Sequence, residues 1–544
     1  MRAADRGEVA FYHCGIATPQ LRRTNLLLHH TIGSSTRHSA GYRTPSLRTY
    51  PALHLLAALT LTTALGAQAQ GTPAALDLPQ MGEPADLTLS PAQEAKIGAE
   101  VAAELYGGDY LVEDPEVSDY INSVGWKLAA KGAAAPVPFK FYVIGDPRIN
   151  AFAVPGGLVG INAGLLLSAD NESELAGVMG HEQAHVTQRH LARTAADTRT
   201  ANIATWAAMI AAIIAGSANP DVIFGALALG QSVNYQREVN YTRAHELEAD
   251  RIGIHTMAEA GYDPEGMASF FAKLEQQSRL YGAGLPEILR THPVNTTRIA
   301  EARARAEALP KTEHRDSVEF SLMKARTQVL MAERVNEAVD DFGRRLRAGD
   351  NSPAVRYGYA FALSKVGRAD DGLEALKPLV ASLPRQVNVQ LLQAELLADS
   401  GHSAEGRALL AKALTLNPRY APAILAQAQA LLDDKKPAEA RQLLLTRDQA
   451  LGTRVETYRL LSEASRQLGN IAESQFQIAT YYLQRGDQRG ALTQLDAGLR
   501  LASLDPQDRA RLSAMRQDLI EKIPKNVLAD INRGDRRYRN TYGQ

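Results

Sequence analysis

The hydrophobic and polar positions of this 544-residue chain change pattern along its length. Between about residues 90 and 309, stretches of helical periodicity alternate with short stretches in which every second residue is apolar, which predicts helices mixed with strands. From about residue 317 the periodicity is helical throughout and recurs at a fixed interval. The pattern therefore predicts a mostly helical α+β domain with a small sheet, followed by an all-α repeat domain.

The first of these regions opens with a helix-start signal and then turns to strands. Ser90 is suited to cap a helix with Pro91 at its first position, and a second helical pattern covers residues 117–131. Residues 139–144 alternate as a strand, and residues 150–162 predict two short strands joined by a Pro-Gly-Gly turn. An edge strand there could hold an extended substrate by main-chain pairing, although a purely structural hairpin fits the sequence equally well.

The second region repeats with a period of 34 residues. Residues at equivalent positions of successive repeats are Gly367, Gly401, Lys435 and Gly469, with Pro384 and Pro418 at the same interval. Such a period, with small residues where helices meet, is typical of tetratricopeptide repeats, which stack into a superhelix. The concave face of a superhelix of this kind binds peptides or partner proteins. Residues 506–544 predict a capping helix and a solvated basic tail.

A strongly apolar segment at residues 203–229 interrupts the first region. Its two arms, 203–214 and 222–229, are each shorter than a bilayer crossing requires. We interpret the segment as an apolar helical hairpin that covers a cleft or makes a peripheral contact with a membrane surface. A pair of helices in the protein core fits the same pattern, and the sequence leaves this choice open.

Composition and charge exclude some functions. The chain has 59 basic and 60 acidic residues and a formal net charge of -1, so no overall field attracts nucleic acid. A nucleic-acid partner is therefore not expected. Hydrophobic residues make up 45% of the chain, which suits domains with proper cores and excludes wholesale disorder.

The N-terminal part of the chain predicts export. The apolar run at residues 53–65 is followed by small residues up to Ala69, as in a secretory signal peptide cleaved after Ala69, with a non-cleaved anchor as the alternative. Residues 1–48 are rich in arginine, histidine and serine. We interpret them as the product of a start codon upstream of the true one, with an organellar transit peptide as the alternative. The single cysteine, Cys14, lies there, so a mature protein without thiols suits the bacterial periplasm.

Candidate chemistry lies on two helical segments of the first region. His181 and His185 are four residues apart, so on a helix they share a face and can bind one metal ion. Glu182, one step round that helix, can reach a water on the same metal. About sixty residues later, Glu246 and Asp250 repeat the spacing and offer a third ligand. Two histidines and one carboxylate leave the fourth tetrahedral position of a single zinc ion open, as in a catalytic site, which predicts peptide-bond hydrolysis.

The surroundings of this motif favour a buried site over surface histidines on an exposed helix. Asn171, with a glutamate three residues later, predicts the N-cap of the motif helix, to which the preceding strands lead directly. Apolar residues surround the two histidines, so both are expected to be partly buried and to need a partner. Glu248 and His245 are rival third ligands, but they lie on other helix faces than Asp250, which favours Glu246.

These motifs together resemble a known family. The HEQAH run at 181–185 with the VTQRH run that follows at 186–190, the ELEADR run at 246–251, and Thr291-His292-Pro293 with Arg298 are similar to those of the family-48 gluzincin metallopeptidases. The resemblance covers most of the mature chain and implies a zincin-like fold for the first domain. Together with a signal peptide and tetratricopeptide repeats, it narrows to the periplasmic branch of the family, whose members enhance the assembly of outer-membrane beta-barrels.

The resemblance also implies roles for single residues. The implied zinc ligands are His181, His185 and Glu246. Glu182 is the implied general base, and Asp250 orients a ligand histidine, which the chemistry of zinc sites also favours. His292 matches a histidine that can occupy the open zinc position and hold the enzyme latent. The sequence does not name the group that stabilises the oxyanion, and Arg298 and His292 are the residues to test for that role.

Two functions of different classes fit this organisation. The predicted parts are an upstream extension with signal peptide at 1–69, a leader at 70–89, a zinc metallopeptidase domain at 90–309, a tetratricopeptide repeat domain at 317–510 and a C-terminal tail at 511–544. The first function is a periplasmic zinc endopeptidase for quality control of outer-membrane beta-barrel proteins, whose repeats recruit misassembled substrates or the assembly machinery. The second is a chaperone-like assembly factor with latent proteolysis. The intact metal motif favours the first, since a pure adaptor has no use for Glu182.

Overall fold

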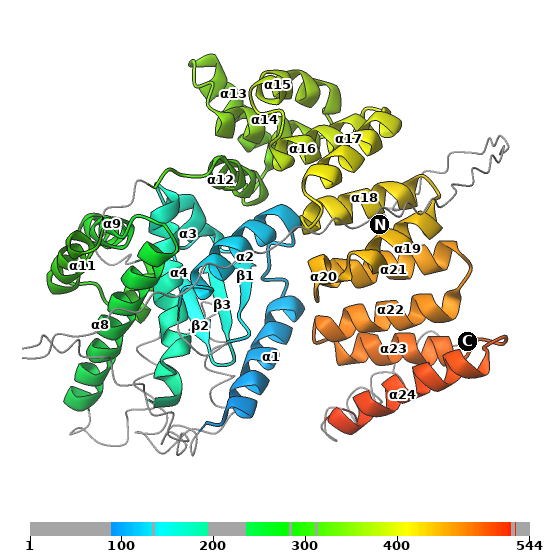
Figure 1. Ribbon diagram of the computed structural model, residues 1–544, viewed down its shortest axis with the longest axis horizontal. Coiled ribbons are helices and arrows are strands. Elements are labelled where there is room, and N and C mark those ends of the chain that lie inside the picture. The colour runs from blue at the N-terminus through cyan, green and yellow to red at the C-terminus, as the bar shows by residue number, and fades with distance from the viewer. Residues whose placement is uncertain are drawn as a thin grey trace, which may run out of the picture. The chain divides into compact units, whose positions relative to one another are not determined.

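The computed structural model describes residues 89–132, 137–193, 235–281, 286–310, 314–523 and Leu528 (Figure 1). The predicted signal peptide, most of the leader, the apolar segment 203–229 and the basic tail lie outside the described residues. Among the described helices, none is long and apolar enough to cross a membrane. A mostly helical domain with a small three-stranded sheet, followed by successive helices, confirms the predicted fold class.

The first domain opens with two helices, α1 (Pro91–Gly107) and α2 (Pro115–Ala129). Ser90 accepts the backbone N–H of Gln93, and the Gln93 side chain accepts the N–H of Ser90, so the predicted start of α1 is confirmed. Asp114 accepts two backbone N–H groups in the first turn of α2. Because Pro115 also suits the first helical position, α2 begins before the predicted residue 117.

Three strands form a mixed sheet: β1 (Lys140–Ile144), β2 (Ala151–Val154) and β3 (Leu158–Asn162). The central strand β3 is parallel to β1 and antiparallel to β2, which confirms the predicted hairpin. Gly156 and Gly157 at its tip have φ angles of 86° and 89°, a conformation that glycine adopts without a Cβ clash. The strand order makes β2 an edge strand of the described sheet.

The site-bearing helices follow: α3 (Ala163–Ser168), α4 (Glu172–Thr187), α8 (Tyr235–Glu259), α9 (Glu265–Tyr281), α10 (Glu287–Thr291) and α11 (Thr296–Ala308). The predicted cap of α4 is confirmed, since Asn171 accepts the backbone N–H of Glu174 at 2.9 Å. The short α3 separates the strands from α4, so the predicted direct connection is wrong. A Cβ on Gly253 of α8 would lie 2.9 Å from the backbone nitrogen of His181, so glycine lets α8 approach α4 closely.

The remaining helices are α12 (Val318–Leu330), α13 (Val335–Arg347), α14 (Pro353–Lys365), α15 (Ala369–Ser382), α16 (Val387–Asp399), α17 (Ser403–Leu416), α18 (Ala421–Asp433), α19 (Pro437–Thr446), α20 (Asp448–Leu451), α21 (Val455–Gln467), α22 (Ile471–Gln484), α23 (Gln488–Leu499) and α24 (Pro506–Lys522). Consecutive helices pack as antiparallel neighbours along most of this array (Figure 1). Helical pairs in series are the arrangement that the repeat pattern predicted.

The 34-residue period falls on the turn inside each helical pair. The four equivalent residues Gly367, Gly401, Lys435 and Gly469 follow α14, α16, α18 and α21. All four have a positive φ, from 59° at Lys435 to 87° at Gly401. In this left-handed conformation the first helix ends and the chain turns into the second. Lys435 adopts it at some cost, because its Cβ crowds the following carbonyl.

The buried core continues across the predicted boundary between the two domains. Helix α12 packs on α2 and α3 as well as on α14, and one cluster of buried side chains includes both Val117 of α2 and Phe320 of α12. The predicted boundary at residue 510 lies inside α24, whose Leu512 and Leu519 are buried in a cluster with side chains of α22 and α23. Helix α24 is therefore packed as part of the array.

A second buried feature joins α2 to the later helices. This Arg326 cluster consists of Asp114, Glu116, Arg326, Tyr357 and Asn388. Arg326 Nε lies 2.9 Å from both oxygens of Asp114, and Nη1 lies 2.9 Å from Glu116 Oε1 and from the Tyr357 hydroxyl. Asn388 donates to Glu116 at 2.8 Å. Burial raises the pKa of Glu116 to about 7, whereas at Asp114 the attraction of Arg326 outweighs burial and lowers the pKa.

Candidate metal centre

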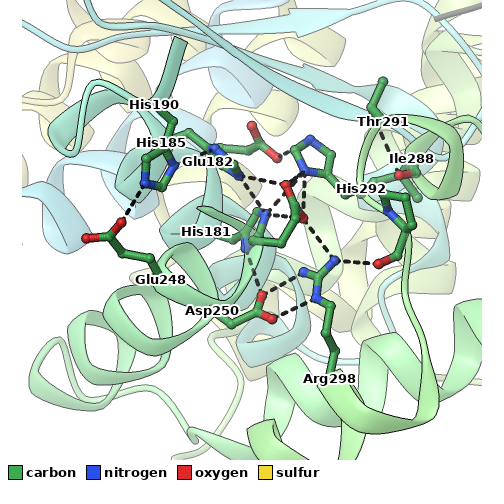
Figure 2. Close-up of polar contacts among 12 residues, drawn as sticks. His181, Glu182, His185, His190, Glu248, Asp250, Ile288, Thr291, His292 and Arg298 are labelled. Atoms are coloured by element: carbon green, nitrogen blue, oxygen red, sulfur yellow. Dashed lines mark hydrogen bonds and ion pairs between the residues drawn. The ribbon is translucent and has the colours of Figure 1, made fainter. Parts of the chain in front are cut away.

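Four side chains from three helical segments converge beside the contact of α4 with α8 (Figure 2). This metal-centre group consists of His181 and His185 of α4, Glu246 of α8, and His292 at the end of α10. One nitrogen or oxygen of each residue lies within 4.8 Å of one from every other. His181 and Glu246 are buried, and the other two are half-buried. The fold thus brings together the residues that the sequence proposed as ligands.

Distances within the metal-centre group fit a small tetrahedral cation. His181 Nε2 lies 3.0 Å from His185 Nε2 and 3.5 Å from Glu246 Oε2. His185 Nε2 lies 3.4 Å from Glu246 Oε1. His292 Nδ1 lies 3.3 Å from His181 Nε2 and 3.1 Å from Glu246 Oε1. Nitrogen and oxygen ligands of tetrahedral zinc, at about 2.0–2.1 Å from the ion, are about 3.3–3.4 Å apart, so the donor set suits such an ion.

His181 lies close to the carboxylate of Asp250, the residue to which the resemblance gives the role of orienting a ligand histidine. Its Nδ1 lies 2.9 Å from Asp250 Oδ1, which leaves Nε2 facing the rest of the metal-centre group. Arg298 donates to both Asp250 oxygens at 2.7 Å. Arg298 Nη1 lies 2.9 Å from Glu246 Oε2 and 2.8 Å from the Pro293 carbonyl oxygen. Each of the three guanidinium nitrogens thus has an acceptor, and Arg298 joins the carboxylates of Asp250 and Glu246.

His185 contacts a second histidine, His190, for which the sequence predicted no role. His190 Nδ1 lies 2.9 Å from His185 Nδ1, and His190 Nε2 lies 3.2 Å from Glu248 Oε2 (Figure 2). Arg193 lies 3.1 Å from the same Glu248 oxygen. The ring of His245 stacks on that of His190 with a centroid distance of 4.2 Å. The two rival third ligands, Glu248 and His245, therefore face His190 and are not members of the metal-centre group.

Glu182, the predicted general base, lies on the other side of His292. Only 1% of Glu182 is exposed, and its Oε1 lies 3.4 Å from His292 Nε2. His292 therefore lies between two carboxylates, with Nδ1 toward Glu246 and Nε2 toward Glu182. A buried carboxylate in this position can accept a proton from a water that enters the metal-centre group.

Burial and the neighbouring carboxylates shift the pKa values of the group in opposite directions. Burial lowers the pKa of His181, but its contacts with Asp250 and Glu246 outweigh this and raise the pKa to about 10. Burial raises the pKa of Glu246, but the contacts with His292 and His181 hold it well below its usual range. Burial lowers the pKa of His190 to about 2. At His185, burial outweighs the contact with Glu246 and lowers the pKa. The carboxylates of Glu246 and Asp250 thus favour a cation, whether a proton or a metal ion, at His181.

Sequence comparison identifies the family to which this centre belongs. The model of Peptidase family M48 matches residues 115–306, which contain the metal-centre group with Glu182, Asp250 and Arg298. The Beta-barrel assembly-enhancing protease of Escherichia coli (strain K12) is 37% identical over 332 residues, which are 61% of this chain and 67% of that protein. The chain belongs to peptidase family M48. This confirms the predicted family and the prediction of a metallopeptidase.

Other similarities are more distant. The mitochondrial metalloendopeptidase OMA1 of Arabidopsis thaliana is 32% identical over 204 residues, which are 37% of this chain and 39% of that protein. Among solved structures, a thermophilic TPR protein of Thermus thermophilus is 23% identical with a TM-score of 0.26, and the match covers 36% of this chain and 98% of that one.

Proposed function

We propose that this M48 metallopeptidase is a zinc-dependent endopeptidase of the periplasm that degrades misassembled outer-membrane beta-barrel proteins or components of the machinery that inserts them. The metal-centre group carries the proposal, since the donor atoms of His181, His185 and Glu246 lie between 3.0 and 3.5 Å apart beside the buried Glu182. The substrate class rests on the name of the Escherichia coli relative. The periplasmic location rests on the predicted signal peptide, with Ala69 as its last residue.

The proposed ligands of one zinc ion per chain are His181, His185 and Glu246. Two imidazoles and a carboxylate are a donor set that zinc peptidases use, which supports zinc over harder cations such as magnesium. A bound zinc ion supplies a Lewis acid that polarises the scissile carbonyl and makes a water acidic. Glu182 accepts the proton from that water and later delivers it to the leaving amine. Asp250 holds His181 with Nε2 directed at the ion.

His292 gives the proposed zinc site a fourth protein donor, which we propose holds the enzyme latent. Its Nδ1 lies as close to Glu246 and His181 as the proposed ligands lie to one another. A catalytic zinc site needs an open position for water and substrate, and His292 fills that position. The residue follows the five-residue helix α10, so a local shift of this short segment would open the position without moving α4 or α8.

Substrate is proposed to bind in extended form along β2. This strand is at an edge of the described sheet and packs against α4, which carries two of the proposed ligands. Pairing through main-chain hydrogen bonds accepts many sequences, because the backbone is common to all of them. A quality-control protease needs such tolerance, since misassembled proteins share a conformational state and not a sequence.

The repeat helices α13 to α23 are proposed to recruit substrates or the outer-membrane assembly machinery. A polar cavity of about 340 Å³ lies between the ends of α18 and α21, lined by residues that include Gln429, Asp433, Arg459, Glu463 and Gln467. Amide and charged side chains of both signs suit a polar stretch of polypeptide. The alternative function is a chaperone-like assembly factor whose proteolysis is latent. The length of the repeat array favours this alternative.

Digestion of casein by the purified protein, with zinc quantified in the same samples, tests the proposal. We expect one zinc ion per chain, activity that disappears in Glu182→Gln, and higher activity in His292→Ala than in the unaltered protein. His402→Ala is the matched control for His292→Ala, because His402 is an exposed histidine on the repeat helices. If one zinc ion binds but no variant cuts casein or an unfolded beta-barrel protein, the assembly-factor alternative replaces the endopeptidase.

A further inference from the structure

His185 has a neighbour on its far side that gives the ring a fixed orientation. His185 directs Nε2 into the metal-centre group, so in the neutral ring Nδ1 carries the proton. That nitrogen lies 2.9 Å from Nδ1 of His190, which is buried. We propose that His190 is a positioning residue that accepts this proton in a hydrogen bond and aims His185 at the metal. The inference rests on the proposed function, because it takes His185 as a ligand.

The hydrogen bonds continue beyond His190 in one direction. Since its Nδ1 accepts, the proton of His190 lies on Nε2, which is 3.2 Å from Glu248 Oε2. Arg193 Nη1 lies 3.1 Å from the same oxygen and holds the carboxylate in place. Each ring nitrogen in this relay therefore has one role, and the relay ends on a carboxylate paired with an arginine. Reversing either histidine tautomer would set two N–H groups, or two lone pairs, against each other.

One face of helix α8 contacts the metal-centre group, and another face contacts His190. Glu246 and Asp250, four residues apart, face the metal-centre group, whereas His245 and Glu248, three residues apart, face His190. The ring of His245 stacks on His190 with an interplanar angle of 9°, which fixes the plane of the His190 ring. A flip of the His190 ring within its plane would lose the hydrogen bonds to His185 and Glu248, and a rotation out of that plane would also lose the stack on His245.

The two proposed histidine ligands thus differ in how each is linked to a carboxylate. His181 contacts the Asp250 carboxylate directly, at 2.9 Å, and Arg298 pairs with that carboxylate. His185 reaches its carboxylate only through the neutral ring of His190. Loss of the group that accepts a hydrogen bond from a metal-binding histidine typically lowers metal affinity by about 10–100-fold. Loss of His190 should therefore weaken metal binding without removing any ligand.

Zinc affinity measured by competition with a chelator, and the visible absorption spectrum of the cobalt(II)-substituted protein, test the inference on the full chain. We expect His190→Leu to bind zinc about 10–100-fold more weakly and to shift the cobalt spectrum, because His185 loses its acceptor. His190→Asn supplies an amide oxygen near the place of Nδ1 and should restore most of the affinity. His255→Leu is the matched control, since His255 is an exposed histidine on α8.

Equal zinc affinity and an unchanged cobalt spectrum in His190→Leu would overturn the inference. Nitrogen-15 NMR of the histidine rings in the unaltered, zinc-loaded protein needs no variant to fold. The inference predicts a proton on Nδ1 of His185 and on Nε2 of His190, and a proton on Nδ1 of His190 contradicts it. An unaltered protein that binds no zinc overturns the proposed function and this inference together, whereas equally tight binding by all variants overturns the inference alone.

Discussion

The metal-centre group and the Arg326 cluster are both buried and charged, but they differ in how donors meet acceptors. In the Arg326 cluster, the guanidinium faces two carboxylates and a hydroxyl at 2.9 Å, so each contact joins a donor to an acceptor. In the metal-centre group, imidazole nitrogens face one another at 3.0 and 3.3 Å beside the carboxylate of Glu246. The first arrangement is complete with the atoms of the chain, and the second requires a cation among its nitrogens.

This difference separates a structural cluster from a chemical site. Burying charge alone does not indicate function, since paired and hydrogen-bonded charges also occur in cores. Lone pairs that converge on one point are costly unless a proton or metal ion lies between them. The convergence of acceptors, more than the burial of charge, is therefore the feature that points to metal chemistry in this protein.

The largest expected effect is on turnover and leaves the metal in place. Glu182→Gln should lower kcat by about 10²–10⁴-fold, because the amide cannot accept a proton from water. Zinc content should stay the same, since Glu182 is not among the proposed ligands. Steady-state peptide hydrolysis and metal analysis of the same sample check this. A variant that loses zinc along with activity would mean that Glu182 holds the metal.

Breaking the Arg326 cluster should cost stability and leave the chemistry of each folded molecule intact. Arg326→Met leaves Asp114 and Glu116 buried without their cation, which should cost about 3–5 kcal/mol of unfolding free energy. Denaturant titration measures the loss. Arg344→Met is the matched control, because Arg344 is exposed and its change should stay within about 0.5 kcal/mol. Equal losses in both variants would show that the cluster contributes no special stability.

Metal removal should distinguish the two buried groups directly. A ligand present at about a thousand times its Kd adds about 4 kcal/mol to the folded state, so a chelator should lower the Tm of the unaltered protein. Arg326→Met should show the same decrease on metal removal, since the Arg326 cluster shares no residue with the metal-centre group. Scanning calorimetry with and without chelator measures both decreases. No decrease in the unaltered protein would contradict a metal held by these residues.

The smallest expected effect is a pH dependence of stability. The pKa of Glu116 is raised from 4.5 to about 7 by burial, so the folded protein retains a proton that the unfolded chain releases within this window. Stability contributed by this group is therefore lost as pH rises from about 4.5 to 7, by about 3 kcal/mol. Glu116→Gln should not show this loss of stability with rising pH. Glu405→Gln, which changes an exposed residue, should show it as the unaltered protein does. Denaturant titrations at several pH values compare the three proteins.

Local signals in the sequence predicted much of the fold. Ser90 and Asn171 were recognisable as caps because a cap satisfies N–H groups within the next three residues. The turn positions from Gly367 to Gly469 were recognisable because every repeat needs the same left-handed turn. The boundary predicted at residue 510 cut through α24, because the burial of Leu512 against earlier helices is a long-range contact.

In the candidate site, too, local spacing was predictable from the sequence and long-range contacts were not. Sequence spacing revealed His181 and His185, because residues four apart on a helix must share a face. His190 belongs to the run that resembles the family, but no role was predicted for it, because it lies five residues beyond His185 and past the end of α4, where no helical spacing relates the two rings. Its partner Glu248 was considered only as a ligand, and the fold instead directs it to His190.

The sequence by itself determined the starts of α1 and α4, the repeat period and the pair of histidines, because each depends on residues within one or two helical turns or on a periodic pattern. Only the tertiary structure decided that His190 meets Glu248, 58 residues away, and that Arg326 pairs with Asp114, 212 residues away. Contacts over such distances follow from how whole helices pack. In this chain that packing depends on close approaches such as the one at Gly253, which a local pattern does not contain.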